Sequence, residues 1–303
     1  MPAAWLWIPI TIWAAFAQTL RNAAQRHLTA ELGTLGATLV RFLYGVPFAA
    51  VWLWGVQKFT ALPLPVPAAA FWLWVLVAGV SQIAATALLL RVMAERNFTL
   101  GVAYSKTELI QVAVFGFAFL GDRVSAATGA AIACGTLGVL LLSPADRARP
   151  LGSLLGGLAS RTALLGLASG AGFALAAVGY RGAALALHAE FLMAGAYTLV
   201  AAQVVQTVLL GGWLLVRNFD SLRRVLRAWR ASLFAGFMGA AASAGWFTAM
   251  AIEPVAHVRT LGLIELLFSY VVSRRVFRER LSRIELGGIA LLSLGLVIVT
   301  LAR

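Results

Sequence analysis

Charged residues are scarce in this sequence. Only 12% of its 303 residues are Asp, Glu, Lys or Arg, whereas 61% are hydrophobic and the mean hydropathy is +0.90. A soluble domain has about 45–50% apolar residues. The composition therefore excludes an ordinary water-soluble protein, because so much apolar surface needs lipid to cover it.

Sequence motifs of catalysis and metal binding are also missing. The single cysteine, Cys134, leaves neither an internal disulfide nor a cysteine-based metal site. The sequence has no H-E-x-x-H motif, no Walker loop and no pair of histidines at metal-ligand spacing. The nearest approach to a nucleophile elbow, around Ser169, has Leu167 where glycine is required. We therefore expect no enzymatic activity, no metal and no cofactor.

The positive charge does not indicate a nucleic-acid partner. The formal net charge is +13, but nearly all of the cations are arginines in short segments between apolar runs. Such arginines are typical of membrane topology signals and of contacts with lipid headgroups. The expected partners are therefore the lipid bilayer and a small-molecule substrate, with no nucleic acid.

Apolar runs long enough to cross a bilayer are abundant. A spanning helix needs about 20 mostly apolar residues. We place ten spans at about 3–20, 33–54, 70–90, 98–120, 124–142, 162–180, 191–216, 232–251, 257–273 and 284–301. This pattern predicts an all-α membrane protein with about ten transmembrane helices, multi-pass in a bacterial cytoplasmic (inner) membrane, as a monomer or homodimer.

The sequence contains an internal repeat. A shift of 157 residues lays Glu108-Leu109 on Glu265-Leu266, and the acidic turn that begins at Asp122 on the one that begins at Glu279. Each copy holds five spans, an odd number, so the second copy enters the membrane in the opposite sense. We predict two inverted five-helix repeats, residues 1–143 and 162–303, joined by a connector at 144–161. This architecture places a substrate site between the halves.

Three features are shared with a known family. They are Arg41-Phe42 in the second span, the acidic-x-x-Ser turns Asp122 to Ser125 and Glu279 to Ser282, and the glycine-bearing fifth and tenth spans. In these features the chain resembles the drug/metabolite transporter superfamily, EamA type. The resemblance implies a two-repeat, ten-helix fold that exports or exchanges small metabolites, and it does not identify a substrate.

Two arguments disagree on the orientation in the membrane. Under the ten-span scheme, one side collects most of the arginines, from Arg21 and Arg26 in the first connector to Arg280 and Arg283 in the last. The positive-inside rule puts that side in the cytoplasm and both termini outside, whereas the family resemblance implies cytoplasmic termini. We favour the charge bias because it recurs in both halves.

Five ionisable side chains fall inside predicted spans: Arg41, Lys106, Glu108, Arg259 and Glu265. A charge near the bilayer centre costs at least about 2.5–3.5 kcal/mol, so each needs a partner or a water-filled cavity. Glu108 and Glu265 occupy equivalent repeat positions, and we expect them to bind protons or a cationic group. The three cations are expected to contact substrate. The structural alternative has Arg41 bonded to a helix end or to carbonyls, and Arg259 paired with Glu265.

Polar residues also form a stripe on the fourth span. Tyr104, Glu108, Gln111 and Phe115 follow i, i+4, i+7, i+11 spacing, which places them on one helix face. This face is predicted to line a cavity, with Tyr104 and Gln111 among the substrate-binding residues. Gln82 is added to them, although interhelical hydrogen bonding is the commoner use of a buried amide.

A cavity of mixed charge suits a zwitterion or a carboxylate-bearing solute. We therefore predict a secondary transporter, exporter or exchanger, of a small organic metabolite such as an amino acid, working by alternating access. Without an ATP-binding motif, the expected energy source is a gradient, with proton coupling one form, or exchange. Two alternatives stay open: an organic-phosphate or nucleotide-sugar exchanger, and a non-transporting membrane scaffold or lipid-handling subunit.

Overall fold

The computed structural model describes residues 5–95, 108–121, 125–142 and 161–277, with single residues between 287 and 298. Every regular element within these ranges is a helix. The predicted all-α class is therefore confirmed for the described part of the chain. Tyr104, Lys106, the acidic turns at 122–124 and 279–282, and positions 144–160 of the predicted connector lie outside it.

The first helix, α1 (Trp7–Leu43), contains a reversal of the chain. Gly33 has a φ of 70° and a ψ of 172°, a backbone conformation that glycine adopts without steric cost. The side-chain nitrogen of Gln25 donates a hydrogen bond to the carbonyl oxygen of Ala37 at 2.8 Å. Twelve residues of continuous helix would separate these positions by about 18 Å. The chain therefore turns back at Gly33 and runs on into α2 (Val46–Thr60).

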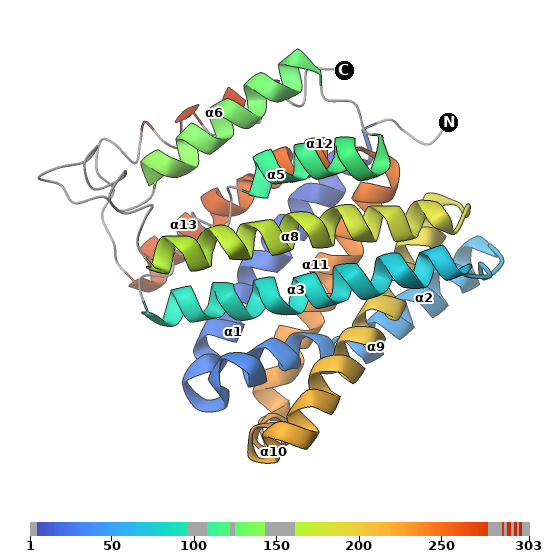
Figure 1. Cartoon of the computed structure of the whole chain (residues 1–303), viewed down its shortest axis with the longest axis vertical. Helices are drawn as coiled ribbons and strands as arrows, with labels where there is room; N and C mark the ends of the chain where they lie inside the picture. The colour runs from blue at the N-terminus through green and yellow to red at the C-terminus, as the bar shows by residue number, and fades with distance from the viewer. Residues whose placement is uncertain are drawn as a thin grey trace, which may run out of the picture.

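The other helices follow in chain order around this hairpin (Figure 1). Their bounds are α3 (Ala69–Glu95), α5 (Glu108–Phe115), the π-helical turn η1 (Gly116–Leu120), α6 (Ala126–Leu142), α8 (Arg161–Ala186), α9 (Phe191–Arg217), α10 (Phe219–Arg227), α11 (Trp229–Ile252), α12 (Val255–Leu261) and α13 (Ile264–Phe277).

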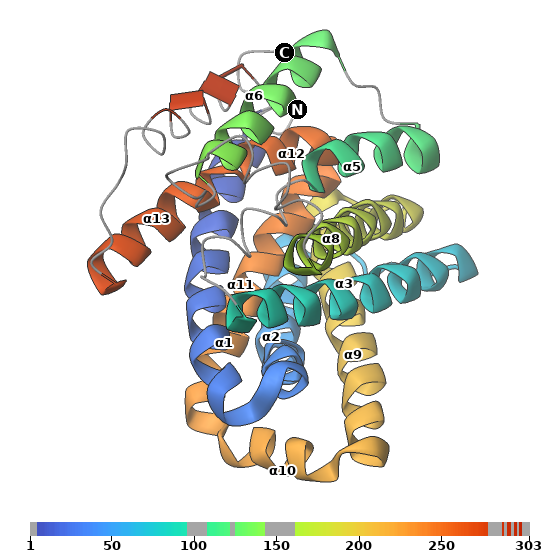
Figure 2. The ribbon, with the colours of Figure 1, turned by 60° about the vertical axis from the view of Figure 1, so that its left-hand side comes forward.

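Two helix pairs form the centre of the molecule. α1 packs along α11, and α3 packs along α8, and both pairs lie side by side in Figures 1 and 2. A Cβ atom added to Gly245 of α11 would lie 2.8 Å from the Cβ of Ala14, and one added to Gly172 of α8 would lie 2.9 Å from the Cβ of Ala85. Glycine thus lets the backbones approach closely, which is how helices commonly pack inside membranes.

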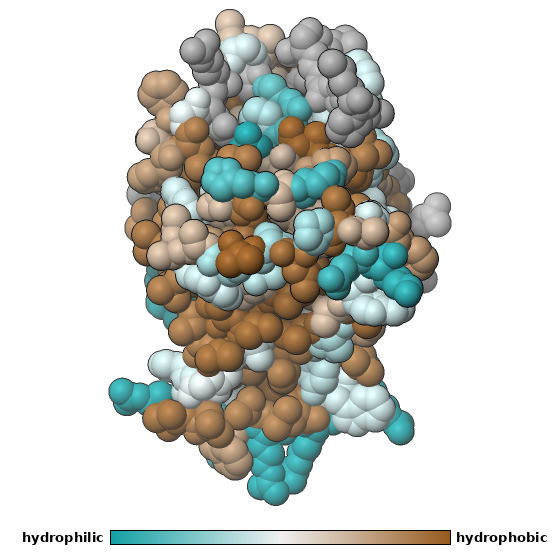
Figure 3. Space-filling view, turned by 90° about the vertical axis from the view of Figure 1, so that its right-hand side faces the viewer, coloured by the Kyte–Doolittle hydropathy of each residue, from teal (hydrophilic) through white to brown (hydrophobic). Residues whose placement is uncertain are grey.

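The described helices have the length and composition of membrane spans. Six segments qualify: Trp7–Thr60, Ala69–Met93, Leu164–Ala186, Phe191–Arg217, Trp229–Ile252 and Val255–Val272. The first has 54 residues, about 80 Å of helix against a hydrocarbon core of about 30 Å, which agrees with the reversal at Gly33. Figure 3 shows brown, apolar residues over most of the described part of one face, with hydrophilic residues at its lower end and in patches across its upper half. The chain is an integral membrane protein.

The sequence placed the end of the first span too early. We predicted a span over about 3–20 and assigned Arg21 to an arginine-rich connector, but the helix continues to Gly33 and the Arg21 side chain is only 2% exposed. That assignment was wrong because it treated the first arginine as the end of the apolar run. Buried polar residues at Asn22 and Gln25 continue the helix beyond it.

Candidate functional site: a polar cavity between the central helices

A small polar cavity lies among the central helices. Its lining combines five ionisable side chains with amides, a hydroxyl and aromatic rings: Gln18, Arg21, Asn22, Arg41, Gln82, Leu89, Glu108, Phe173, Ser243, Trp246, Phe247, Arg259 and Glu265. We call this the polar cavity. Gln82 and Ser243 lie close to the middle of α3 and α11, so the cavity sits at mid-membrane depth. Its volume is about 20 Å³, which is room for about one water molecule.

Glu265 is held by side-chain amides from α1. The Nε2 atom of Gln18 donates to one carboxylate oxygen at 2.7 Å, and the Nδ2 atom of Asn22 donates to the other at 3.0 Å. Two amide donors suit an ionised carboxylate, which only accepts hydrogen bonds. Glu265 also lies in the first turn of α13, where the helix dipole favours negative charge. Both oxygens of this carboxylate therefore have a side-chain donor from α1.

Arg21 joins the same network through Asn22. Its Nε and Nη2 atoms donate to the Asn22 side-chain oxygen at 3.3 and 2.7 Å. Asn22 thus accepts from a cation and donates to an anion, which connects Arg21 to Glu265 electrostatically. The i, i+3, i+4 spacing of Gln18, Arg21 and Asn22 places all three on one face of α1.

Arg259 contacts Glu108 and Trp246 in the lining of the cavity. Its Nη1 atom lies 3.7 Å from a carboxylate oxygen of Glu108, at the long end of an ion pair. Its guanidinium carbon lies 4.7 Å from the ring centre of Trp246, in range of a cation–π interaction. The indole nitrogen of Trp246 donates to the side-chain oxygen of Gln18 at 2.9 Å, so this group connects to the network around Glu265.

Arg41 has hydroxyl partners instead of a carboxylate. Its Nη1 atom donates to Thr86 at 3.3 Å and its Nη2 atom reaches Ser243 at 3.5 Å. The side chain is buried, and the described residues place no ion-pair partner beside it. A charged side chain without a carboxylate partner is costly at mid-membrane depth, which makes Arg41 a candidate binding residue.

All three guanidinium groups keep a buried N–H without an acceptor. These atoms are Nη1 of Arg21, Nε of Arg41 and Nε of Arg259, within the described part of the chain. A buried donor without a partner costs about 1–3 kcal/mol, and more when it is charged. Groups of this kind are rare in folded proteins and call for a specific reason. An anionic oxygen ligand would satisfy them.

Amides and aromatic rings form the rest of the lining. The side-chain oxygen of Gln82 accepts from the Tyr180 hydroxyl at 3.1 Å and from Nε2 of Gln206 at 2.8 Å. The Tyr180 ring packs on Phe247 with 4.4 Å between ring centres. These contacts tie α3, α8, α9 and α11 together beside the charged residues, and they fix the orientation of Gln82.

The structure brings together five of the eight side chains that the sequence proposed for the site. Arg41, Gln82, Glu108, Arg259 and Glu265 all line the polar cavity. Gln111 is not among the lining residues, although its buried side-chain oxygen has no partner within the described residues. Tyr104 and Lys106 lie outside the described residues. Arg259 lies within ion-pair distance of Glu108, and its alternative pairing with Glu265 stays a prediction.

Sequence reasoning missed the polar face of α1 and most of the contribution from α11. Gln18, Arg21 and Asn22 carry a signal that was available, namely their helical spacing, but the early end assigned to the span hid it. Ser243 and Trp246 carried no such signal. Their partners Arg41 and Gln18 are more than 200 residues away in the chain, and only the packing of α11 on α1 brings them together.

Comparison with known proteins establishes the fold and nothing finer. No family model and no curated protein sequence matches this chain. A solved structure described as "Crystal structure of protein" is similar over 98% of this chain and 96% of its own, with a TM-score of 0.65 and 15% sequence identity. At that identity the likeness concerns the fold alone, over nearly the whole of both chains.

Proposed function

We propose that this chain is a secondary transporter of a small carboxylate-bearing organic solute, most simply an amino acid or a monocarboxylate, that works by alternating access. The observation that carries the proposal is the set of three buried guanidinium groups around one cavity, each with an N–H that lacks an acceptor among the described residues. A carboxylate supplies two oxygens with about four lone-pair sites, and arginine is the side chain that matches them best.

Charge balance supports the same substrate class. Among the described lining residues, Arg21, Arg41 and Arg259 outnumber Glu108 and Glu265 by one. A ligand that brings a carboxylate to Arg41 would neutralise the cation that has no carboxylate beside it. An amino group on the same solute would face the pair of glutamates. Charge-assisted hydrogen bonds from the bound solute would then offset the cost of keeping these charges away from water.

Ten spans in two inverted repeats are part of this proposal. Glu108 and Glu265, 157 positions apart, both line the cavity. In the predicted repeat, α8 corresponds to the part of α1 before Gly33, and α11 corresponds to α3. The contact between α3 and α8 is then the counterpart of the contact between α1 and α11. Both pairs have a glycine packed closely against an alanine, Gly245 on Ala14 and Gly172 on Ala85. Inverted repeats commonly surround such mid-membrane sites.

The dimensions of the cavity favour a mechanism with an occluded state. A space of about 20 Å³ is too small for an amino acid, so the substrate enters only after the helices move. The backbone breaks between α12 and α13, at Gly262 and Leu263, separate Arg259 from Glu265. Discontinuous helices at substrate sites are typical of secondary transporters, and relative motion of these two halves would open the cavity.

A ligand screen followed by counterflow tests the proposal. Purified protein is heated with neutral amino acids, monocarboxylates and phosphate esters in separate samples, because a ligand that binds only the folded state raises the melting temperature. The compounds that stabilise the protein are then tested for counterflow in proteoliposomes. We expect stabilisation and counterflow with a carboxylate compound. Stabilisation without counterflow would favour a non-transporting receptor or scaffold, and no effect of any carboxylate would refute the proposal.

A phosphate-bearing substrate is the second candidate. The excess of arginine over glutamate in the cavity is the observation that favours it, because guanidinium groups also bind phosphate in a bidentate manner. The same screen separates the two candidates. Stabilisation by phosphate esters, with none by monocarboxylates or amino acids, would select an organic-phosphate or nucleotide-sugar exchanger.

A further inference from the structure

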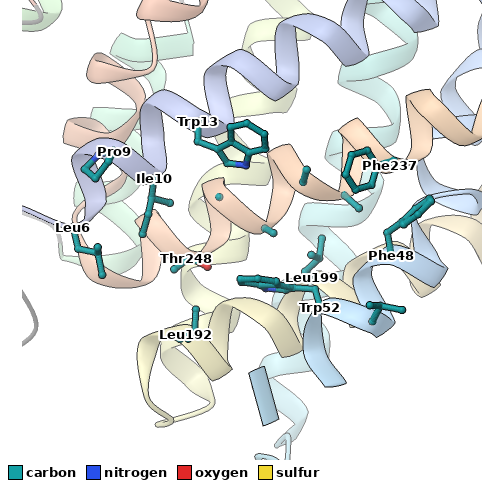
Figure 4. A pocket seen from close by; sticks show the side chains of 15 residues that line it. Leu6, Pro9, Ile10, Trp13, Phe48, Trp52, Leu192, Leu199, Phe237 and Thr248 are labelled. Atoms are coloured by element: carbon teal, nitrogen blue, oxygen red, sulfur yellow. The ribbon is translucent and has the colours of Figure 1, made fainter. Parts of the chain in front are cut away.

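A second, much larger hollow opens on the outside of the helix bundle. It has a volume of about 640 Å³ and is walled by α1, α2, α9 and α11 (Figure 4). The described lining residues are aliphatic or aromatic except for Thr248, and none carries a charge. We call this the apolar groove. It shares α1 and α11 with the polar cavity but has none of its lining residues.

We propose that the apolar groove is a binding site for one acyl chain of a membrane phospholipid, inserted from the membrane face at which α11 ends. The site is separate from the proposed transport site and does not depend on the solute that is transported. Three observations carry the inference: the absence of charge, the length of the groove and its closed inner end.

The length of the groove matches one leaflet of a bilayer. Along α11 the lining runs from Phe237 to Thr248, eleven residues, or about 16 Å of helix. Half of the hydrocarbon core of a bilayer is about 15 Å. Thr248 lies four residues before the last residue of α11, Ile252, so the outer end of the groove is near the membrane surface and the inner end is near the midplane.

The inner end is closed by two aromatic rings. Phe48 of α2 and Phe237 of α11 meet edge to face, with 5.1 Å between their ring centres. Beyond the rings, the floor of the groove is formed by small residues of α11, among them Ala241 and Ala244, which leave space where larger side chains would fill it. A thin, flexible hydrocarbon chain fits a trough of this shape.

Thr248 lies at the outer end of the groove, where α9 packs on α11. Its side chain is 3% exposed. A Cβ atom added to Gly195 of α9 would lie 3.0 Å from the backbone nitrogen of Thr248 and 3.1 Å from its hydroxyl oxygen. The outer end of the groove is therefore bordered by a close contact between these two helices.

A second copy of the chain is a poorer occupant. A symmetric dimer brings the same patch of both subunits together, so it would place one hollow over another and leave the floor uncovered. An acyl chain is complementary in shape to the groove, and acyl chains are present at high concentration in the membrane. A lipid acyl chain therefore fits the groove better than a second copy of the chain does. Chain-to-chain crosslinks would reveal a dimer.

Photocrosslinking tests the site directly. The full-length protein is reconstituted in phosphatidylethanolamine and phosphatidylglycerol vesicles that contain a phospholipid with a photoactivatable group on its acyl chain. It is then extracted in detergent, washed free of bulk lipid, irradiated and mapped by peptide mass spectrometry. We expect retained adducts concentrated on groove residues of α2 and α11. Adducts spread over the whole apolar surface, or lost on washing, would overturn the proposal, as would chain-to-chain crosslinks through the groove.

Two variants sharpen the test. Ala244→Phe fills the floor and is expected to reduce retained groove adducts at least tenfold, whereas Ala168→Phe, the same change on the exposed side of α8, should retain them. Ala241→Leu adds a smaller side chain to the same floor and is expected to reduce retention severalfold. Unchanged adducts in both groove variants would refute the site. Should Ala244→Phe fail to fold, Ala241→Leu alone decides.

Discussion

The polar cavity and the apolar groove lie on opposite faces of the same pair of helices, and they differ in every physical respect. On α11, Ser243 and Trp246 line the cavity while Ala244 and Thr248 line the groove. The cavity is crowded by long polar side chains and measures about 20 Å³, and the groove is emptied by small residues and measures about 640 Å³. The larger hollow is the chemically simpler one.

Volume alone would point to the apolar groove, whereas the proposed transport site is the smaller hollow. Apolar hollows at the lipid boundary cost little, because lipid fills them. A cluster of buried charges at mid-membrane depth is expensive and is retained when function requires it. The wall between the two sites is thin, since Gly245 of α11 lies directly against Ala14 of α1. Changes on either side of this wall therefore test whether the two faces act independently.

The largest effect is expected from Arg41→Met. Arg41 is the cation of the cavity that has no carboxylate partner among the described residues. Its removal should lower transport of the solute found in the screen at least about 30-fold, because truncating a buried charged contact costs about 2–5 kcal/mol. Stability should be kept or increased, because an uncompensated buried charge is removed. Counterflow and thermal melting measure the two effects.

Arg227→Gln on the exposed helix α10 is the matched control and should transport normally. A destabilised Arg41→Met protein would indicate the structural role instead. Retained groove adducts in Arg41→Met would show that the loss is confined to the cavity side of the wall.

Glu265→Gln is expected to have the next largest effect. The carboxylate accepts hydrogen bonds from Gln18 and Asn22, and an amide would turn a donor toward one of them. Hydrogen bonds to a charged group are each worth about 1.5–3 kcal/mol, so counterflow should fall about 10- to 100-fold. Glu31→Gln, on an exposed turn of α1, should leave counterflow unchanged. Equal rates in the two variants would remove Glu265 from the mechanism.

Gly245→Ala tests the wall itself. The new Cβ would lie 2.8 Å from the Cβ of Ala14, and overpacking of this kind typically costs about 1–3 kcal/mol. Thermal melting in detergent should show the loss, and both transport and lipid retention should decrease. The double variant Ala14→Gly with Gly245→Ala exchanges the two residues and should restore most of the stability. Failure of the double variant to recover would show that the loss has another origin.

The sequence predicted the ionisable residues of the site better than their partners. Glu108, Glu265, Arg41 and Arg259 stood out because charge in an apolar run is costly, and that argument needs no tertiary structure. Arg21 was lost because the span was ended at a charge, although the helix continues to Gly33. The pairing of Arg259 with Glu108 could not be predicted, since periodicity assigns a residue to a helix face and does not say which helix packs on it.

The apolar groove could not be predicted from sequence in any form. Ala240, Ala241 and Ala244 are typical of a transmembrane helix, and nothing in their order separates a tightly packed face from an empty one. The hollow is walled by four helices, so it depends on the packing of the whole bundle. The internal repeat and the orientation of the chain in the membrane both stay predictions.

The smallest expected effect concerns the hydroxyl of Ser243. It is 3.5 Å from Nη2 of Arg41, a long contact, so Ser243→Ala should weaken transport only about twofold, near the lower limit of about 0.5 kcal/mol for a net hydrogen bond. Ser232→Ala is the same change on α11, at a buried hydroxyl outside both the cavity and the groove, and should leave counterflow unaltered. A tenfold loss in Ser243→Ala would mean that this hydroxyl contacts the solute itself, and the geometry around Arg41 would then change on binding. Equal rates in the two variants would instead leave Thr86 as the hydroxyl that orients Arg41.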